Sequence, residues 1–417
     1  MKVLFVHQNF PGQYKHIAAA LADDGRNKVV AIGEKPNLGR LGHPRIVEIG
    51  YDKPQGASDT IHHYVRNLES GVRRGQAVTR VALDLRRKGF HPDIICCHPA
   101  WGEGLYLEDI WPKSKRLYYF EFYYRPRGFD ADFDPEFPGS FDDTFRIHTK
   151  NAVNLFSLNS ADWGVTPTHW QASSMPPEYR PKISIIHDGI DTELVRPNPD
   201  IAVKLPNGVR VTRADEVITF VNRHLEPYRG FHTFMRALPL IQHRRKNAQV
   251  LIVGDDEPGY GIAAKDAKNH REKYMREVGD KLDLSRVHFL GRIPYDSFVK
   301  MLQLSAVHVY LTYPFVLSWS MLEAMSAGCL VVGSRTPPVE ELISHGHNGL
   351  LVDFFKPREI ADMIDRVLNH PDRMPAIRDE ARRTIVANYD LKTICLPKHL
   401  QLIETLAAGK RPQSEAA

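Results

Sequence analysis

The chain has 417 residues, a length that favours two α/β domains over one. Its composition, 42% hydrophobic and 25% charged, is that of a globular protein, and the net charge of +5 is compatible with an anionic small molecule or a membrane surface as partner. The absence of an apolar run of ~20 residues excludes a membrane span, and four cysteines without a paired spacing exclude a disulfide framework.

Short apolar runs alternate with longer amphipathic stretches along the chain, which is typical of repeated β-α units. Continuous apolar runs indicate strands buried on both faces of a parallel sheet. In the first half, the predicted strands are Val3–Val6, Val29–Gly33, Asp93–His98, Arg116–Phe122, Trp163–Pro167 and Ile183–His187. In the second half, they are Val217–Asn222, Gln249–Gly254, Val287–Leu290, Val307–Thr312, Cys329–Gly333 and Gly349–Val352. The two series predict two doubly wound, Rossmann-like α/β domains.

The boundary between the two series is predicted where proline and glycine interrupt regular structure, and we place a linker near residues 190–212. We expect an N-terminal domain over residues 1–195 and a C-terminal domain over 196–388. The last segment, 389–417, is expected to form a helix that packs back towards the N-domain, followed by a disordered tail. Ligands of open α/β sheets bind at the carboxyl ends of strands, so the expected site is a central cleft that both domains face.

Two arginines lie in the loop that follows the first strand of the second half. Arg223 and Arg229 stand six residues apart, and a helix is predicted to begin just after Gly230. A guanidinium group forks onto phosphate oxygens, and a helix N-terminus adds partial positive charge. The pair therefore suits a diphosphate, although two solvated surface arginines would leave the same local pattern.

A second loop follows the strand Val307–Thr312 and leads into a helix that carries Glu323 in an otherwise apolar stretch. A carboxylate in this setting can accept both hydroxyls of a ribose. The alternative is a helix capping box formed by Ser320 and Glu323. Backbone N–H groups of Leu317, Ser318 and Trp319 are expected to point out of the helix start, where they can bind phosphate or sugar oxygens.

These two segments resemble the retaining glycosyltransferases of family 4, which have the GT-B fold. The segments Ala161–Pro167 and Ile185–Asp191 resemble the last N-domain strands of that family and its turn into the linker. Phe289–Pro294 resembles the strand end whose loop contacts the nucleobase, and Glu323–Val332 resembles the "EAMAxGxPVV" helix. The similarity extends over nearly the whole chain and is strongest from Ile183 to Asp353.

The resemblance implies a role for each matching residue. Arg223 and Arg229 would clamp the donor diphosphate, Glu323 would bind the ribose, and Gly12 would let the N-domain backbone approach the diphosphate. His98 would face the transferred sugar. The full set of residues implied in donor binding is Gly12, Arg223, Arg229, Arg292, Ile293, Leu317, Ser318, Trp319, Ser320 and Glu323, and the set implied in catalysis is His98, Arg223 and Arg229.

The chain departs from the family at Phe315. The family's EX7E pattern has its first glutamate eight residues before the second, and here that position is a phenylalanine. The departure puts sugar recognition in question and argues against a mechanism in which this glutamate attacks the anomeric carbon. Retention is then expected to depend on the leaving diphosphate, which accepts the proton of the acceptor hydroxyl on the face from which it departs.

The expected activity is sugar transfer from a nucleotide-diphosphate donor, such as a UDP-, GDP- or ADP-sugar, to a hydroxyl acceptor. We expect a saccharide or lipid-linked glycan acceptor in polysaccharide or glycoconjugate synthesis, with no cofactor, no essential metal and no nucleic acid. The alternatives are a non-catalytic GT-B domain that binds a nucleotide sugar or glycan, and an enzyme that glycosylates a small secondary metabolite. Activity that EDTA abolishes and Mn²⁺ restores would contradict the metal-independent reading.

The region 61–89 is strongly basic. Its cations are Arg66, Arg73, Arg74, Arg80, Arg86, Arg87 and Lys88, against Glu69 and Asp84 as its acidic residues. A basic surface of this kind can contact an anionic membrane, and a solvated helix face is the alternative. The basic region therefore makes a peripheral contact to the inner membrane face an option. The four cysteines, which have no disulfide spacing, favour a cytoplasmic chain with reduced thiols.

Overall fold

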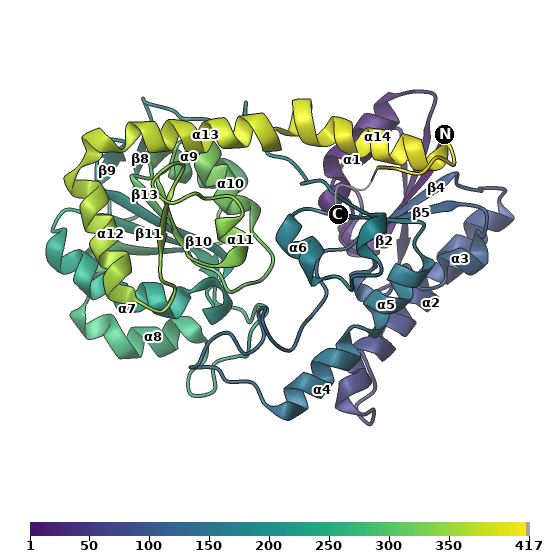
Figure 1. The fold of residues 1–417 in the computed structure, drawn as a ribbon, viewed down its shortest axis with the longest axis horizontal. Helices are drawn as coiled ribbons and strands as arrows, with labels where there is room; N and C mark the ends of the chain where they lie inside the picture. The colour runs from purple at the N-terminus through teal and green to yellow at the C-terminus, as the bar shows by residue number, and fades with distance from the viewer. Residues whose placement is uncertain (414–417) are drawn as a thin grey trace. The chain divides into compact units, whose positions relative to one another are not determined.

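The computed structural model describes residues 1–413, and the chain divides into two compact units (Figure 1). The first unit comprises Met1–Gly189 together with the segment from Lys392, and the second comprises Ile190–Leu391. The predicted disordered tail lies outside the described residues from position 414 onwards. Within residues 1–413, no helix is both long and apolar enough to cross a membrane.

The first unit is built on a seven-stranded sheet with the order β3-β2-β1-β4-β5-β6-β7. Every neighbouring pair of its strands is parallel. The strands are β1 (Lys2–Val6), β2 (Lys28–Glu34), β3 (Ile46–Tyr51), β4 (Ile94–Cys97), β5 (Lys115–Tyr119), β6 (Trp163–Thr166) and β7 (Ile183–Ile185). The continuous apolar runs of β1 and β4 are buried along most of their length, as expected for central strands that both faces cover.

Helices cover both faces of this sheet because successive strand residues point to opposite sides. Val3 and Phe5 pack on one core cluster with helices α1 and α14, and Leu4 and Val6 pack on the other with α2. Figure 1 shows α14 alongside α1. The helices are α1 (Lys15–Asp23), α2 (Arg66–Arg87), α3 (Leu107–Ile110), α4 (Phe141–Lys150), α5 (Ala152–Ser160), α6 (His169–Ser174) and α14 (Leu396–Ala407), with 3-10 helices η1 (Gly12–Tyr14), η2 (Lys35–Asn37), η3 (His63–Val65), η4 (Pro99–Trp101) and η5 (Arg180–Lys182) and the π-helix η10 (Leu391–Cys395), which begins at the last residue of the second unit.

The second unit repeats the plan with a six-stranded sheet of order β12-β11-β10-β13-β14-β15, again parallel throughout. Its strands are β10 (Val217–His224), β11 (Gln249–Asp255), β12 (Val287–Gly291), β13 (Val307–Tyr310), β14 (Val331–Ser334) and β15 (Leu350–Val352). An antiparallel hairpin, β8 (Ala202–Lys204) and β9 (Arg210–Thr212), precedes the sheet.

Helices also cover both faces of the second sheet. Phe220 stacks on Phe234 of α7 with ring centroids 4.5 Å apart, whereas Val217 and Val221 belong to the cluster formed with α9, α10 and α13. The helices are α7 (Phe231–Arg244), α8 (His270–Val278), α9 (Tyr295–Leu304), α10 (Trp319–Ser326), α11 (Pro337–Glu340), α12 (Pro357–Asn369) and α13 (Pro375–Tyr389), with 3-10 helices η6 (Pro227–Arg229), η7 (Gly279–Lys281), η8 (Leu284–Arg286) and η9 (Pro371–Arg373).

Two features differ from the sequence analysis. Strand β3, at the edge of the first sheet, is absent from the predicted strands. The region expected to be a linker, 190–212, contains the hairpin β8–β9, whose turn is the Pro206-Asn207-Gly208 segment that the prediction treated as an interruption. The backbone N–H of Gly208 donates to the carbonyl of Leu205 at 2.9 Å and closes this turn.

Strand order reverses direction once in each sheet, between β1 and β4 in the first and between β10 and β13 in the second. In open α/β sheets, ligands bind beyond the carboxyl ends of the strands at such a reversal. Gly12 and His98 follow β1 and β4, and the two arginines and the loop before α10 follow β10 and β13. These sequence-predicted residues therefore lie at the reversal points, whereas Arg292 and Ile293 follow β12 at the edge of the second sheet.

Candidate active site

In the first unit, Gly12 covers a buried histidine. Gly12 has a φ of +47°, and a Cβ placed there would lie 2.5 Å from Nε2 of His7. Nδ1 of His7 accepts the N–H of Asn9 at 2.9 Å, so Nε2 carries the proton that it donates to Oε1 of Gln13 at 2.8 Å. Burial lowers the pKa of His7 to about 4, against the opposing effect of Gln13, and keeps the ring neutral. A side chain at position 12 would therefore displace the ring that fixes this loop.

His98 lies directly after β4 and is fully buried. Its ring is stacked between Trp101 and Tyr119, with centroids 4.5 and 5.4 Å away. Among the described residues, neither ring nitrogen has a hydrogen-bond partner, and Oε2 of Glu121 is 4.0 Å from Nε2. Burial, with a smaller contribution from His7, places the pKa of His98 well below its ordinary value. The neutral ring thus has one donor and one acceptor available for a polar partner.

The two predicted clamp arginines have contrasting environments at the end of β10. Arg223 is exposed, and within residues 1–413 its guanidinium has no hydrogen-bond or ion-pair partner. Arg229, on η6, is 7% exposed, and its Nη1 donates at 2.8 Å to both Oγ1 of Thr312 and the carbonyl oxygen of Val316. Arg229 therefore fixes the loop after β13, whereas Arg223 offers a guanidinium group that is free to bind an anion.

Phe315, where the resemblance puts the first EX7E glutamate, packs beside Arg229. The Cζ atom of Arg229 lies 5.7 Å from the ring centroid of Phe315 and 5.7 Å from that of Tyr260. Both distances are within the range of a cation–π contact. Phe315 is 2% exposed and meets Tyr228 edge-on at 5.5 Å. The Phe315 side chain thus gives the buried cation an aromatic contact at the position where the resemblance implies an acidic residue.

The start of α10 differs in one respect from the expectation. Ser318 is the N-cap residue, and its Oγ accepts the N–H of Ser320 at 3.3 Å. The N–H of Ser318 already donates to the hydroxyl of Tyr310 at 2.8 Å, so the prediction that this group points freely out of the helix is wrong. Leu317 is buried and Trp319 is 44% exposed.

Glu323 does not form the capping box that was the alternative for this helix. Its Oε1 accepts a hydrogen bond of 2.6 Å from the hydroxyl of Tyr295, the first residue of α9. Burial raises the pKa of Glu323, and the Tyr295 hydrogen bond opposes that shift. Within residues 1–413, the second carboxylate oxygen has no hydrogen-bond partner, so the group retains capacity to accept hydrogen bonds from hydroxyls.

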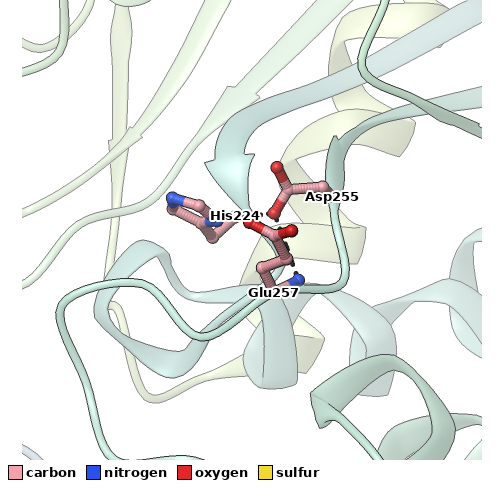
Figure 2. A group of neighbouring side chains, drawn as sticks. All are labelled: His224, Asp255 and Glu257. Carbon is pink, nitrogen blue, oxygen red and sulfur yellow. Dashed lines mark hydrogen bonds and ion pairs between the residues drawn. The ribbon is translucent and has the colours of Figure 1, made fainter. Parts of the chain in front are cut away.

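Arg292 contacts a cluster at the ends of β10 and β11 that consists of His224, Asp255 and Glu257. Figure 2 shows these three side chains. Nδ1 of His224 lies 2.5 Å from Oδ1 of Asp255, and Glu257 completes a group whose potential ligand atoms all lie within 4.8 Å of one another. Arg292 contacts Oδ2 of Asp255 and lies 3.4 Å from Oε2 of Glu257. Its guanidinium therefore already neutralises the carboxylates that could otherwise bind a cation, and it ties the loop of Ile293 to β11.

The structure links the predicted residues within each unit through residues that the sequence analysis did not single out. His7 connects Gly12 with His98, and the ring centroids of His7 and His98 are 5.1 Å apart. Tyr295 connects the Arg292–Ile293 loop with Glu323. His7 follows a predicted strand directly, so the rule that ligands meet carboxyl ends could have found it. The Tyr295–Glu323 pair spans 28 residues and leaves no local signal.

Two doubly wound parallel sheets, each with polar residues at its reversal point, define the GT-B class. Sequence models of two families match the chain: "Glycosyl transferase family 4 group" over residues 25–195 and "Glycosyl transferases group 1" over residues 208–384. The chain belongs to the family 4 glycosyltransferases.

Similar proteins agree with this placement. An uncharacterised glycosyltransferase of Methanocaldococcus jannaschii is 23% identical over 50% of each chain. A D-inositol 3-phosphate glycosyltransferase of Rhodococcus jostii is 25% identical over 48% of this chain and 43% of its own length. The chain thus spans about half the length of the curated relatives it matches.

Solved structures match over almost the whole chain and show the fold. HepE of Anabaena, crystallised with UDP and glucose, has a TM-score of 0.67 at 18% identity and covers 98% of this chain with 100% of its own. Sucrose-phosphate synthase of Thermosynechococcus elongatus has a TM-score of 0.74 at 16% identity with the same coverage.

Proposed function

We propose that the protein transfers a sugar, with retention of anomeric configuration and without an essential metal, from a nucleotide-diphosphate donor to a hydroxyl acceptor. The observation that supports this most directly is the exposed, unpartnered guanidinium of Arg223 at the end of β10, followed six residues later by the buried Arg229, at the strand reversal of the second unit. A diphosphate is the ligand that such a pair and the start of α7 favour. Glu323 would hold the ribose, and the Arg292–Ile293 loop would contact the base.

In the proposed reaction, the bond between the anomeric carbon and the β-phosphate oxygen breaks, and a bond to the acceptor oxygen forms on the same face. The departing phosphate oxygen takes the acceptor proton. Arg223 and Arg229 would stabilise the negative charge that grows on the β-phosphate, which is the contribution that preorganised cations make in such sites. His98 would hydrogen-bond the transferred sugar through its unpartnered nitrogens.

Nucleotide binding tests this proposal. In EDTA, one of UDP, GDP, ADP and TDP, or one of their sugar conjugates, is expected to raise Tm selectively, because a ligand of the folded state stabilises it by about 2.7 kcal/mol at 100 times its Kd. The shift should be lost in Glu323→Gln and reduced in Arg223→Ala. Arg366→Ala removes an exposed cation from α12 of the same unit and serves as the matched control. No shift with any nucleotide at millimolar concentration would favour the non-catalytic alternative.

Tyr295→Phe is expected to weaken nucleotide binding by about 10-fold, since a hydrogen bond to a charged group contributes roughly 1.5 kcal/mol or more. The hydroxyl lowers the pKa of Glu323 against the effect of burial, so its removal raises that pKa further. Nucleotide binding is expected to need the ionised carboxylate of Glu323. As pH falls, Tyr295→Phe should therefore lose nucleotide binding at a higher pH than the wild type does. Calorimetric titration of nucleotide between pH 5 and 8 measures both effects, and superimposable pH profiles would contradict the role given to Tyr295.

The acceptor is proposed to be a saccharide or lipid-linked glycan, and the location the cytoplasm. A peripheral contact with anionic lipid would use the exposed cations of the basic region, which are Arg66, Arg80, Arg86, Arg87 and Lys88. The other two are only partly exposed: Arg73 pairs with Glu69 at 2.7 Å, and Arg74 pairs with Glu34 at 3.2 Å. Of the exposed cations, Arg66 and Arg87 also pair with carboxylates, those of Asp59 at 3.6 Å and Asp84 at 2.8 Å.

A further inference from the structure

A second polar cluster lies at the carboxyl edge of the first sheet, apart from the residues assigned to the donor. Gln8 follows β1, Glu34 ends β2, Tyr51 ends β3, and Glu103 follows β4 and η4. Arg74 reaches the same point from α2. Four adjacent strands thus each contribute one polar side chain next to the reversal between β1 and β4, which is the part of an open α/β sheet where ligands bind.

Acceptor groups surround the guanidinium of Arg74. Its Nη1 donates to Oε1 of Gln8 and lies 3.2 Å from Oε1 of Glu34 and 3.5 Å from Oε1 of Glu103. Two carboxylates therefore neutralise the one cation of the cluster. The arginine holds these groups in place and has little charge left to offer an anion.

Glu103 has an unused hydrogen-bond acceptor in this cluster. Its side chain is fully buried, and Oε1 accepts a bond of 3.1 Å from the hydroxyl of Tyr51. Its Oε2 has no partner among the described residues. Buried polar atoms almost always have a partner, so an orphaned carboxylate oxygen indicates a donor that a ligand or water supplies. Around this oxygen, the side chains of Arg74 and Glu34 are 15% and 10% exposed, and Gln8 is partly exposed.

We propose that this cluster binds the acceptor, and that the acceptor is an uncharged polyhydroxyl compound whose hydroxyls donate to Glu34 and Glu103. The proposal rests on the function proposed above. Carboxylates accept hydrogen bonds from sugar hydroxyls, whereas the same carboxylates repel a phosphate group. The compensated charge of Arg74 gives a phosphorylated acceptor no cation in return. The cluster thus selects a neutral saccharide or polyol over its phosphate ester.

Matched pairs of compounds test this selectivity. Saturation-transfer NMR with nucleotide-loaded protein compares glucose with glucose 6-phosphate, myo-inositol with myo-inositol 1-phosphate, and glycerol with glycerol 3-phosphate. The neutral member of at least one pair is expected to bind at least about tenfold more tightly than its phosphate ester. Equal or tighter binding of the phosphate esters overturns the proposal, and so does the absence of binding by every neutral compound.

Variants identify the residues responsible. Glu34→Gln and Glu103→Gln each remove a carboxylate charge next to Arg74, which leaves the positive charge of Arg74 less compensated. The preference for the neutral compound over its phosphate ester should then fall by about tenfold. Glu69→Gln is the matched control, because Glu69 pairs with the neighbouring Arg73 on the same helix. A preference that is unchanged in both variants, each folded and still able to bind nucleotide, places acceptor recognition elsewhere and overturns the assignment. Nucleotide binding by the second unit is measured in parallel. If the wild type binds no nucleotide, the proposed function is rejected. If it binds nucleotide but shows no preference for neutral compounds, only the acceptor inference is rejected.

Discussion

Arg223→Ala is expected to lower kcat by about 100-fold to 1,000-fold, because removal of one preorganised group that stabilises developing charge has effects of this size. Arg223 is exposed at the end of β10 and has no partner within residues 1–413, so its loss removes no contact that stabilises the fold. The free energy of unfolding should therefore change by no more than about 0.5 kcal/mol, as for other surface substitutions, and Tm should stay close to that of the wild type. A large loss of turnover in a fully folded protein is the result that distinguishes an anion clamp from a solvated arginine.

The measurement is steady-state turnover at saturating donor, together with Tm. Arg223→Lys retains the charge and loses the planar fork, and it should recover part of kcat. Arg366→Ala is the control for the removal of an exposed cation and should retain wild-type turnover. Arg229 is the weaker test, since its buried guanidinium also supports Thr312 and Val316, and its loss would affect folding and catalysis together. Unchanged turnover in Arg223→Ala would remove this residue from the mechanism.

The central strands could be predicted from the sequence because their burial on both faces requires continuous apolar runs, as in β1 and β4. Strand β3 was missed because it is an edge strand and is not buried on both faces. It lies at the sheet edge, and its middle residues are only partly buried, so its sequence does not need an unbroken apolar run. The hairpin β8–β9 has only three residues in each strand, and proline and glycine at its turn give the same signal as a linker.

The site could be predicted only to the level of single loops. The positions of Arg223 and Arg229 follow from the strand that precedes them. Their different environments do not, since the partners of Arg229 come from a loop more than 80 residues later. The same is true of Ser318, whose N–H is occupied by Tyr310, and of Glu103, whose partners come from β3 and α2. Contacts between elements distant in sequence decide which polar groups remain available.

Glu103→Gln is expected to change how the stability of the first unit depends on pH. Burial raises the pKa of Glu103 from its ordinary 4.5 to about 7, against the opposing charge of Arg74. Because the folded pKa is the higher one, the folded state binds the proton more tightly than the unfolded state. The resulting stabilisation is fully present below pH 4.5 and is lost as pH rises through 7. The difference between the folded and unfolded pKa corresponds to roughly 3 kcal/mol of stability. The wild type should lose this stability as pH rises, and the glutamine variant should not.

Urea unfolding of the wild type and of Glu103→Gln between pH 4.5 and 8 measures this difference. Tryptophan fluorescence is a suitable probe, since Trp101, Trp111, Trp163 and Trp170 belong to the first unit. The wild type should lose stability relative to the variant as pH rises. Glu69→Gln should give the opposite sign, because the N–H of Ser58 and the Arg73 side chain lower the pKa of Glu69. If the stability difference between the wild type and Glu103→Gln does not change with pH, the carboxyl of Glu103 ionises normally. Its Oε2 is then solvated and needs no hydroxyl from an acceptor.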